Sequence, residues 1–251
     1  MSPAPRPVIG IAHRGFSPDG AENSMAAFQA AVDLGYRHLE TDARVTGDGV
    51  ALAFHDEILD RVTNHRGQLR QLSWREVSAA RIVGREPIPR LEDVLAAFGE
   101  VHVNIDVKSD AAVGPTLDVL RRTNSWRRVR LAAFSPTRLL QLRRIAGPDT
   151  ATALTAPEVL ALRYRRLGLR TGPPRRPGLA AQVPPWIGPL QVVQPRFIAA
   201  ARERGIAVHV WTINRRAEMI RLLDLGVDAI MTDRADVLRE VLRERGQWQQ
   251  S

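Results

Sequence analysis

The stretch AVHVWTINRRAEMIRLLDLGVDAIMTDRADVLREVLRER, residues 207–245, contains two successive units of the same kind. Each unit is a short apolar run followed by a longer amphipathic segment, which predicts strands at 207–213 and 229–232 and helices at 216–225 and 235–245. Strands that alternate with helices are typical of parallel sheets, because a helix carries the chain back to the start of the next strand. The stretch therefore predicts a parallel α/β fold.

The same alternation runs along the whole chain. Expected strands begin near residues 8, 38, 101, 129, 150, 180, 207 and 229, and a helix-like segment follows each one. Eight such units in 251 residues predict a (β/α)8 TIM barrel. The alternative, a doubly wound open sheet, is less favoured because no Gly-x-Gly-x-x-Gly motif follows the first strand. We interpret residues 45–89 as a small insertion after strand 2, within a single domain over residues 1–251.

The composition is that of a globular protein with a basic excess. A hydrophobic content of 44 % with 25 % charged residues excludes a disordered or fibrous chain. The absence of cysteine excludes a disulfide scaffold, a thiolate metal site and a cysteine nucleophile. No apolar run approaches the roughly 18 residues of a membrane-spanning helix, and no signal-like segment precedes the first strand. We therefore expect a cytoplasmic protein.

The net charge of +9 raises nucleic acid or an anionic membrane as partners. However, the arginines lie among leucines and glutamates at helical spacing, so we interpret most of them as solvated helix surface. The densest basic run, residues 163–177, is expected to form a solvated loop on the barrel face opposite the chemistry. We therefore expect no nucleic-acid partner and do not favour contact with a membrane surface. The sequence leaves the oligomeric state open.

Polar residues cluster where the expected strands end, which is where TIM barrels carry their chemistry. Carboxylate ligands suit a hard divalent cation, Mg²⁺ or Ca²⁺, and two imidazoles suit acid–base work near neutral pH. Basic side chains beside them can hold an anionic group. Together these groups predict metal-assisted cleavage of a phosphate ester. In chain order the cluster is His13, Arg14, Glu40, Asp42, His55, Asp106 and Lys108.

Several stretches, in a fixed order over nearly the whole chain, resemble the glycerophosphodiester phosphodiesterase family of TIM-barrel enzymes. The resemblance implies hydrolysis of a small-molecule glycerophosphodiester to an alcohol and glycerol 3-phosphate. The matching stretches are His13-Arg14-Gly15, Glu22-Asn23-Ser24, Glu40-Thr41-Asp42, His55-Asp56, Asp106-Val107-Lys108, residues 210–214 (VWTIN) and residues 226–233 (GVDAIMTD).

The resemblance also implies a role for each matching site residue. His13 and His55 would be the acid–base pair. Contacts to the substrate would come from five further residues, and three carboxylates would bind the metal. The substrate-binding candidates are Arg14, Lys108, Glu22, Asn23 and Trp211, and the metal-binding candidates are Glu40, Asp42 and Asp106.

The chain departs from the family pattern at two of these places. Asp106 stands where the family commonly has Glu, and its shorter arm bears on the choice between Mg²⁺ and Ca²⁺. Ser24 stands where Thr is usual, and its hydroxyl is expected to cap the helix that begins at Met25. Asp233 is likewise expected to cap the helix at 235–245.

Two other functions remain as alternatives. A lysophospholipase D or phospholipase D that acts on lipid phosphodiesters would need an exposed apolar rim at the barrel mouth. Aromatic residues make up only 5 % of the chain, which favours water-soluble substrates. A non-catalytic protein that binds polyanions would need no metal. The sequence does not identify the leaving alcohol.

Overall fold

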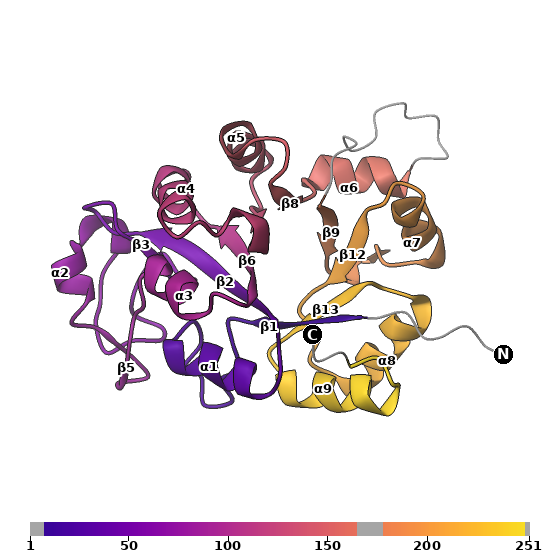
Figure 1. Ribbon diagram of the computed structural model, residues 1–251, viewed down its shortest axis with the longest axis horizontal. Helices are drawn as coiled ribbons and strands as arrows, with labels where there is room; N and C mark the ends of the chain where they lie inside the picture. The colour runs from indigo at the N-terminus through magenta and orange to yellow at the C-terminus, as the bar shows by residue number, and fades with distance from the viewer. Residues whose placement is uncertain (1–7, 165–177, 249–251) are drawn as a thin grey trace.

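The structure, a computed structural model, describes residues 8–164 and 178–248. Within this part of the chain, eight parallel strands form a closed barrel, as predicted (Figure 1). Closure is complete because the first strand pairs with both the last strand and the second. The barrel strands are β1 (Ile9–His13), β2 (His38–Val45), β6 (His102–Val107), β7 (Val129–Ala132), β8 (Ala151–Ala153), β9 (Leu179–Val183), β12 (Ala207–Val210) and β13 (Ala229–Thr232).

Helices follow the strands and form the outer layer of the barrel. Local signals in the sequence explain where several of them begin. The Ser24 hydroxyl accepts from the Ala27 amide as expected, and Ser135 caps another helix in the same way. The helices are α1 (Met25–Asp33), α3 (Leu91–Ala97), α4 (Val113–Arg122), α5 (Pro136–Ala146), α6 (Ala156–Arg163), α7 (Pro195–Arg202), α8 (Arg216–Leu225) and α9 (Ala235–Glu244).

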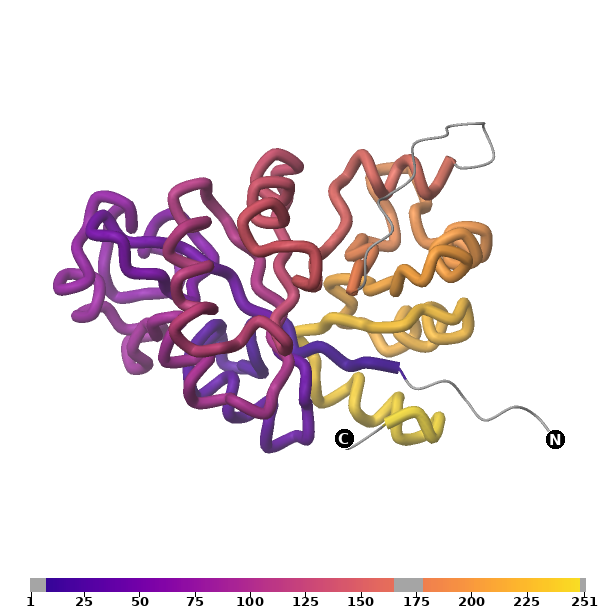
Figure 2. Tube along the Cα trace, turned by 45° about the horizontal axis from the view of Figure 1, so that its top comes forward, coloured from indigo at the N-terminus to yellow at the C-terminus, as the bar shows by residue number. Residues whose placement is uncertain are grey.

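The segment between β2 and α3 builds a small layer on the flank of the barrel, far from α6 and α7 (Figures 1 and 2). Strand β3 (Ala51–Ala53) runs antiparallel to β2, and a separate apolar cluster that includes Phe54, Leu59 and Ile82 packs behind it. This packing holds the chain that leaves β3 at the barrel mouth. The remaining elements here are a 3-10 helix at Leu69–Gln71, α2 (Trp74–Val77), β4 (Arg81–Ile82) and β5 (Glu86–Pro87).

A hairpin stands at the mouth between β9 and α7. Its strands are β10 (Trp186–Ile187) and β11 (Leu190–Gln191), and it exposes Trp186 and Ile187 to solvent. Short 3-10 helices at Asp110–Ala112 and Trp126–Arg128 complete the described elements. Most of the basic run at 163–177 lies outside the described residues; its first residue, Arg163, ends α6.

The barrel interior is more polar than the layers of branched apolar residues that usually fill such barrels. Near the start of the strands, the His38 and His102 rings stack with centroids 4.8 Å apart. Further along, the Gln182 amide donates to the Asn104 side-chain oxygen at 2.7 Å. Within the described residues, no helix has the length and apolar character needed to cross a bilayer.

Candidate active site

His13 ends β1, and its ring is fixed between two carboxylates. Nδ1 lies 2.6 Å from Asp233 Oδ1, and Nε2 lies 3.7 Å from Glu40 Oε2. Asn214 holds Asp233 in turn, since its Nδ2 donates to Asp233 Oδ2 at 2.7 Å. Burial favours the neutral ring, but Glu40 and Asp233 outweigh it and raise the pKa of His13. The predicted cap role of Asp233 is wrong, because the N-cap position of α9 is Arg234 and has no side-chain cap.

His55, which follows β3, is held in the same way. Its Nδ1 lies 2.6 Å from Asp56 Oδ1, and Arg61 forms an ion pair with the other oxygen of Asp56. Both histidines line one pocket. A carboxylate on Nδ1 fixes the tautomer and the orientation of an imidazole, so each ring has its second nitrogen available for proton transfer. The sequence contains both carboxylates in family motifs, but whereas Asp56 is the next residue after His55, only the fold brings Asp233 to His13.

Glu40, Asp42 and Asp106 are buried side by side on β2 and β6, where Asp42 and Asp106 are direct partners in the sheet register. Lys108 Nζ lies between two of them, 2.8 Å from Asp42 Oδ1 and 2.6 Å from Asp106 Oδ2. Arg14 Nε lies 3.0 Å from Asp42 Oδ2. Burial alone would raise the pKa of Asp42, but the two cations outweigh it and lower that pKa. The only lysine of the chain therefore lies inside the acidic cluster.

The acidic cluster fits a divalent cation by its chemistry. In the part of the chain that the structure describes, no three His, Asp or Glu side chains adopt a geometry that could hold a metal ion. However, Asp106 Oδ1 is buried without a hydrogen-bond partner. Burial and the neighbouring Asp42 also raise the pKa of Glu40 to about 7. The negative charges of these closely packed carboxylates are not fully compensated, and a hard divalent cation would compensate them.

Glu22 and Asn23 lie behind the pocket wall and do not line it. The Asn23 amide donates to Asp42 Oδ2 at 3.0 Å, and its oxygen accepts from the Thr41 hydroxyl at 2.7 Å. Glu22 accepts from Arg14 Nη1 at 2.9 Å and also pairs with Arg61. Their contacts hold Asp42 and Arg14 in place.

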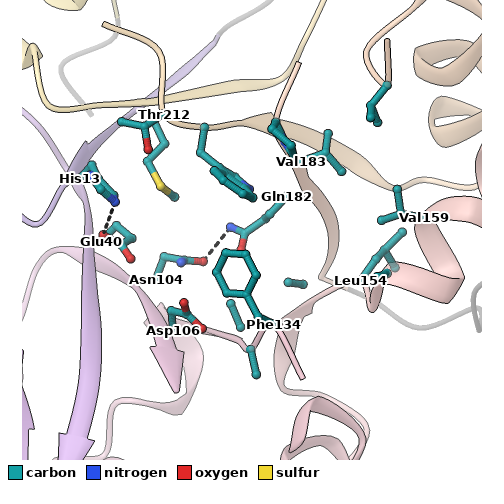
Figure 3. A pocket seen from close by; sticks show the side chains of 18 of the residues that line it. His13, Glu40, Asn104, Asp106, Phe134, Leu154, Val159, Gln182, Val183 and Thr212 are labelled. Carbon is teal, nitrogen blue, oxygen red and sulfur yellow. Dashed lines mark hydrogen bonds and ion pairs between the residues drawn. The ribbon is translucent and has the colours of Figure 1, made fainter. Parts of the chain in front are cut away.

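The pocket has a volume of about 700 Å³ and two unlike ends (Figure 3). His13, Glu40 and Asp106 lie at one end, and Leu154 and Val159 lie at the other. Phe134 stands between them, 69 % exposed, and its ring packs edge-on against Trp211 with centroids 5.6 Å apart. Lys108 Nζ lies 5.4 Å from the centroid of the same ring. Trp211 thus forms part of the pocket wall.

The pocket also has an exposed apolar rim, although the low aromatic content of the sequence favoured a pocket without one. Ile187 of the hairpin and Leu160 of α6 both line the pocket and are 55 % and 46 % exposed. The low aromatic count is misleading because aliphatic side chains from separate elements form most of this wall. Phe134 lies at the end of the strand expected from residue 129, whereas the hairpin carries no sequence signal that identifies it as part of a site.

These groups have complementary chemical abilities. Two imidazoles, each fixed by a carboxylate, face one pocket with two cations and a buried acidic cluster. Imidazoles transfer protons, and cations stabilise the charge that develops on phosphoryl oxygens. On a TIM barrel, this arrangement at the carboxyl ends of the strands defines a hydrolase of phosphate esters.

Comparisons with known proteins identify the family. The family model described as "Glycerophosphoryl diester phosphodiesterase family" matches residues 13–237. A Mycobacterium tuberculosis protein named "Probable glycerophosphodiester phosphodiesterase 2" is 40 % identical over 96 % of this chain and 92 % of its own length. The "Glycerophosphodiester phosphodiesterase" of Caldanaerobacter subterraneus subsp. tengcongensis is 28 % identical over 94 % of this chain and 98 % of its own. The chain therefore belongs to the glycerophosphoryl diester phosphodiesterase family.

Solved structures have the same fold. A phosphodiesterase of Oleispira antarctica, in complex with the product sn-glycerol-3-phosphate, superposes with a TM-score of 0.75 at 21 % identity. The match covers 94 % of this chain and 97 % of that one. The barrel predicted from the alternation of strands and helices is thus the barrel of this structural neighbour.

Proposed function

We propose that this enzyme hydrolyses glycerophosphodiesters to an alcohol and glycerol 3-phosphate. The observation that carries the proposal is the pair of imidazoles, His13 and His55, in one pocket with a carboxylate on Nδ1 of each. Two relatives are named for this activity, and the structural neighbour from Oleispira antarctica holds the corresponding product. Together these findings support both the reaction and the class of substrate.

His13 and His55 transfer the protons in this proposal. One ring takes the proton of the attacking hydroxyl or water through its free nitrogen, and the other ring donates a proton to the leaving alkoxide. Asp233 and Asp56 keep the proton on each Nδ1, so that the second nitrogen of each ring is the one that exchanges protons with the substrate.

Arg14 and Lys108 bind the phosphate in this proposal. Both side chains are largely buried beside Asp42, so their charges lie in a region of low polarity where they act strongly on a phosphoryl oxygen. Trp211 forms the wall against which the substrate lies.

Glu40, Asp42 and Asp106 would hold a divalent cation, Mg²⁺ or Ca²⁺. When bound, such an ion withdraws charge from a phosphoryl oxygen. The unpartnered Asp106 oxygen and the raised pKa of Glu40 support this assignment. Residues 45–89 serve the same catalytic domain in this proposal, because they contain His55, which lines the pocket, and Arg61, which pairs with Glu22 outside the segment.

A panel of glycerophosphodiesters tests the proposal. The protein is treated with EDTA and then supplied with Mg²⁺ or Ca²⁺, and the release of glycerol 3-phosphate is measured for choline, ethanolamine and glycerol esters. We expect release to stop with EDTA and to return with one of the two ions. Turnover of none of these esters, with either ion present, would refute the proposed function.

The apolar rim favours a second candidate function, D-type cleavage of a lipid phosphodiester. The rates of hydrolysis of glycerophosphocholine and lysophosphatidylcholine distinguish the two functions. A kcat/KM at least tenfold higher for the lipid would establish the second function as the main one.

A further inference from the structure

The half of the pocket away from the histidines has no role in the hydrolysis itself. Residues from α6 and its preceding loop form one side of it, and residues from β9 to β11 form the other. We call this half the apolar arm. Its lining side chains are Leu154, Val159, Leu160, Val183, Ile187 and Leu190.

The apolar arm is continuous with the reacting end of the pocket. Phe134 and Trp211 stand where the two halves meet, and Figure 3 shows Leu154 and Val159 beyond Phe134 as seen from His13. A volume of about 700 Å³ lies in the upper part of the range of roughly 300–1,000 Å³ for small-molecule sites. A group attached to the phosphate can therefore extend from the catalytic end into the arm.

The charges around the described part of the arm disfavour a cationic occupant. Among the described residues that line it, no carboxylate lies beyond the acidic cluster at the catalytic end. Arg163 also lines the pocket, and within the described residues its buried Nε and Nη1 have no hydrogen-bond partner. A choline or ethanolamine group in the arm would meet this cation of the same sign, whereas a hydrocarbon chain gains from burial against aliphatic walls.

We propose that the apolar arm is a subsite for an uncharged hydrocarbon chain carried by the phosphodiester substrate, with Leu160 and Ile187 as residues that determine its preference for chain length. The proposal rests on the proposed function, because the phosphodiester must be held at His13 and His55 for the chain to enter the arm. The chain can be attached on the alcohol side or on the glycerol side of the phosphate.

Two series of substrates test this subsite and its source. The first contains glycerol 3-phosphate esters of ethanol, butanol, hexanol and octanol. The second contains glycerophosphoethanol with alkyl ethers of the same lengths on the glycerol, and both are used below their micelle concentrations. Each methylene that enters the arm should raise kcat/KM about fourfold, the equivalent of about 0.8 kcal/mol. A rise in one series alone supports the subsite and identifies the side that carries the chain.

Leu160→Glu and Ile187→Glu place a charge in the arm at positions that are already half exposed, so the barrel should fold. We expect each variant to lower the ratio of kcat/KM for octyl to ethyl substrates at least tenfold. Leu140→Glu is the matched control, because Leu140 on α5 is 53 % exposed and does not line the pocket. It should leave the ratio unchanged.

Calorimetry with ethyl phosphate and octyl phosphate tests the arm without turnover, because it compares their dissociation constants directly. This separates the subsite from the proposed function: octyl phosphate should bind at least tenfold more tightly even if no ester is hydrolysed. The subsite is refuted if kcat/KM is flat in both series and the two phosphates bind equally. It is also refuted if Leu160→Glu and Ile187→Glu change the octyl-to-ethyl ratio no more than Leu140→Glu does.

Discussion

Asp233 is the residue whose contacts best explain how His13 works. It lies on Nδ1 of the ring and receives a hydrogen bond from Asn214 on its other oxygen. In Asp233→Asn, one carboxylate oxygen becomes an NH2 group, which is a donor. It would face the Asn214 donor in one orientation of the amide and the His13 ring N–H in the other. We therefore expect kcat to fall about 10- to 100-fold, with a small change in KM.

The matched control for Asp233 is Asp236→Asn. Asp236 pairs with Arg234 on the surface at the start of α9, so its loss should leave kcat unchanged. If Asp233→Asn had the kcat of the control, the contact with His13 would have no positioning role.

Lys108 offers a second test at the scale of one residue. Its ammonium fits between Asp42 and Asp106, and little of the side chain reaches solvent. Arginine is longer and has a planar fork, so Lys108→Arg should displace one of the carboxylates. We expect kcat/KM to fall at least tenfold. If the variant were equally active, the site would not require lysine at position 108, and the presence of one lysine among 36 basic residues would have no functional cause.

The loop after β1 shows how an element end sets the site. Gly15 has φ of +83°, and a Cβ there would lie 2.6 Å from the Ala27 carbonyl carbon on α1. Only glycine lets the chain turn this closely over the helix directly after His13 and Arg14. Gly15→Ala should therefore lower the free energy of unfolding by about 2–4 kcal/mol, measured by urea denaturation.

Gly49→Ala is the control that separates close contact with α1 from backbone strain in the loss of free energy of unfolding. Gly49 also has positive φ, but a Cβ added there would have no atom within 4 Å. Its substitution should cost only the backbone strain of about 1–2 kcal/mol. Equal losses for the two variants would contradict the role of close contact between the loop and α1.

At the scale of elements, the sequence predicts most of the fold because each barrel strand is an apolar run that a helical pattern follows. The starts of all eight expected strands lie within a residue or so of the observed ones. The β10–β11 hairpin is not predicted, because each of its strands has only two residues, too few for a periodic pattern. The apolar arm is missed because its side chains come from the hairpin and from elements separate in sequence, and only the fold brings them together.

The polar interior makes the stability of the whole barrel depend on pH. Burial lowers the pKa of His209 to about 3 and that of His38 to about 4. Both rings stay neutral in the folded barrel, whereas in the unfolded chain they protonate near pH 6.5. The stabilisation from a lowered histidine pKa is complete above that pH and is lost as the pH falls, since protons then bind mainly to the unfolded chain.

We therefore expect His209 to contribute a loss of about 1 kcal/mol in the free energy of unfolding between pH 7.5 and 5.5. In His209→Gln this part of the slope should disappear, whatever the change in total stability. His65→Gln, at an exposed position between β3 and α2, should keep the slope. Urea denaturation at several pH values measures it, and the same slope in both variants would contradict a neutral, buried His209.

For the molecule as a whole, the sequence predicts which residues meet at the mouth but not how they are paired. The strand ends alone bring His13, Asp42 and Asp106 together. The pairing of Lys108 with two carboxylates depends on the register of β2 against β6, and the contact of Asp233 with His13 depends on barrel closure. The contacts of Lys108 with Asp42 and of Asp233 with His13 join residues distant in sequence, so no local pattern reveals them.

In the proposed function, His13 and His55 carry the hydrolysis of a glycerophosphodiester. The most direct measurement is the release of glycerol 3-phosphate from glycerophosphocholine by His13→Ala and His55→Ala, with the divalent ion that best supports the unmodified enzyme. Both variants should keep a cooperative unfolding transition and lose at least 100-fold in kcat. Release at an unchanged rate by either folded variant would contradict the account.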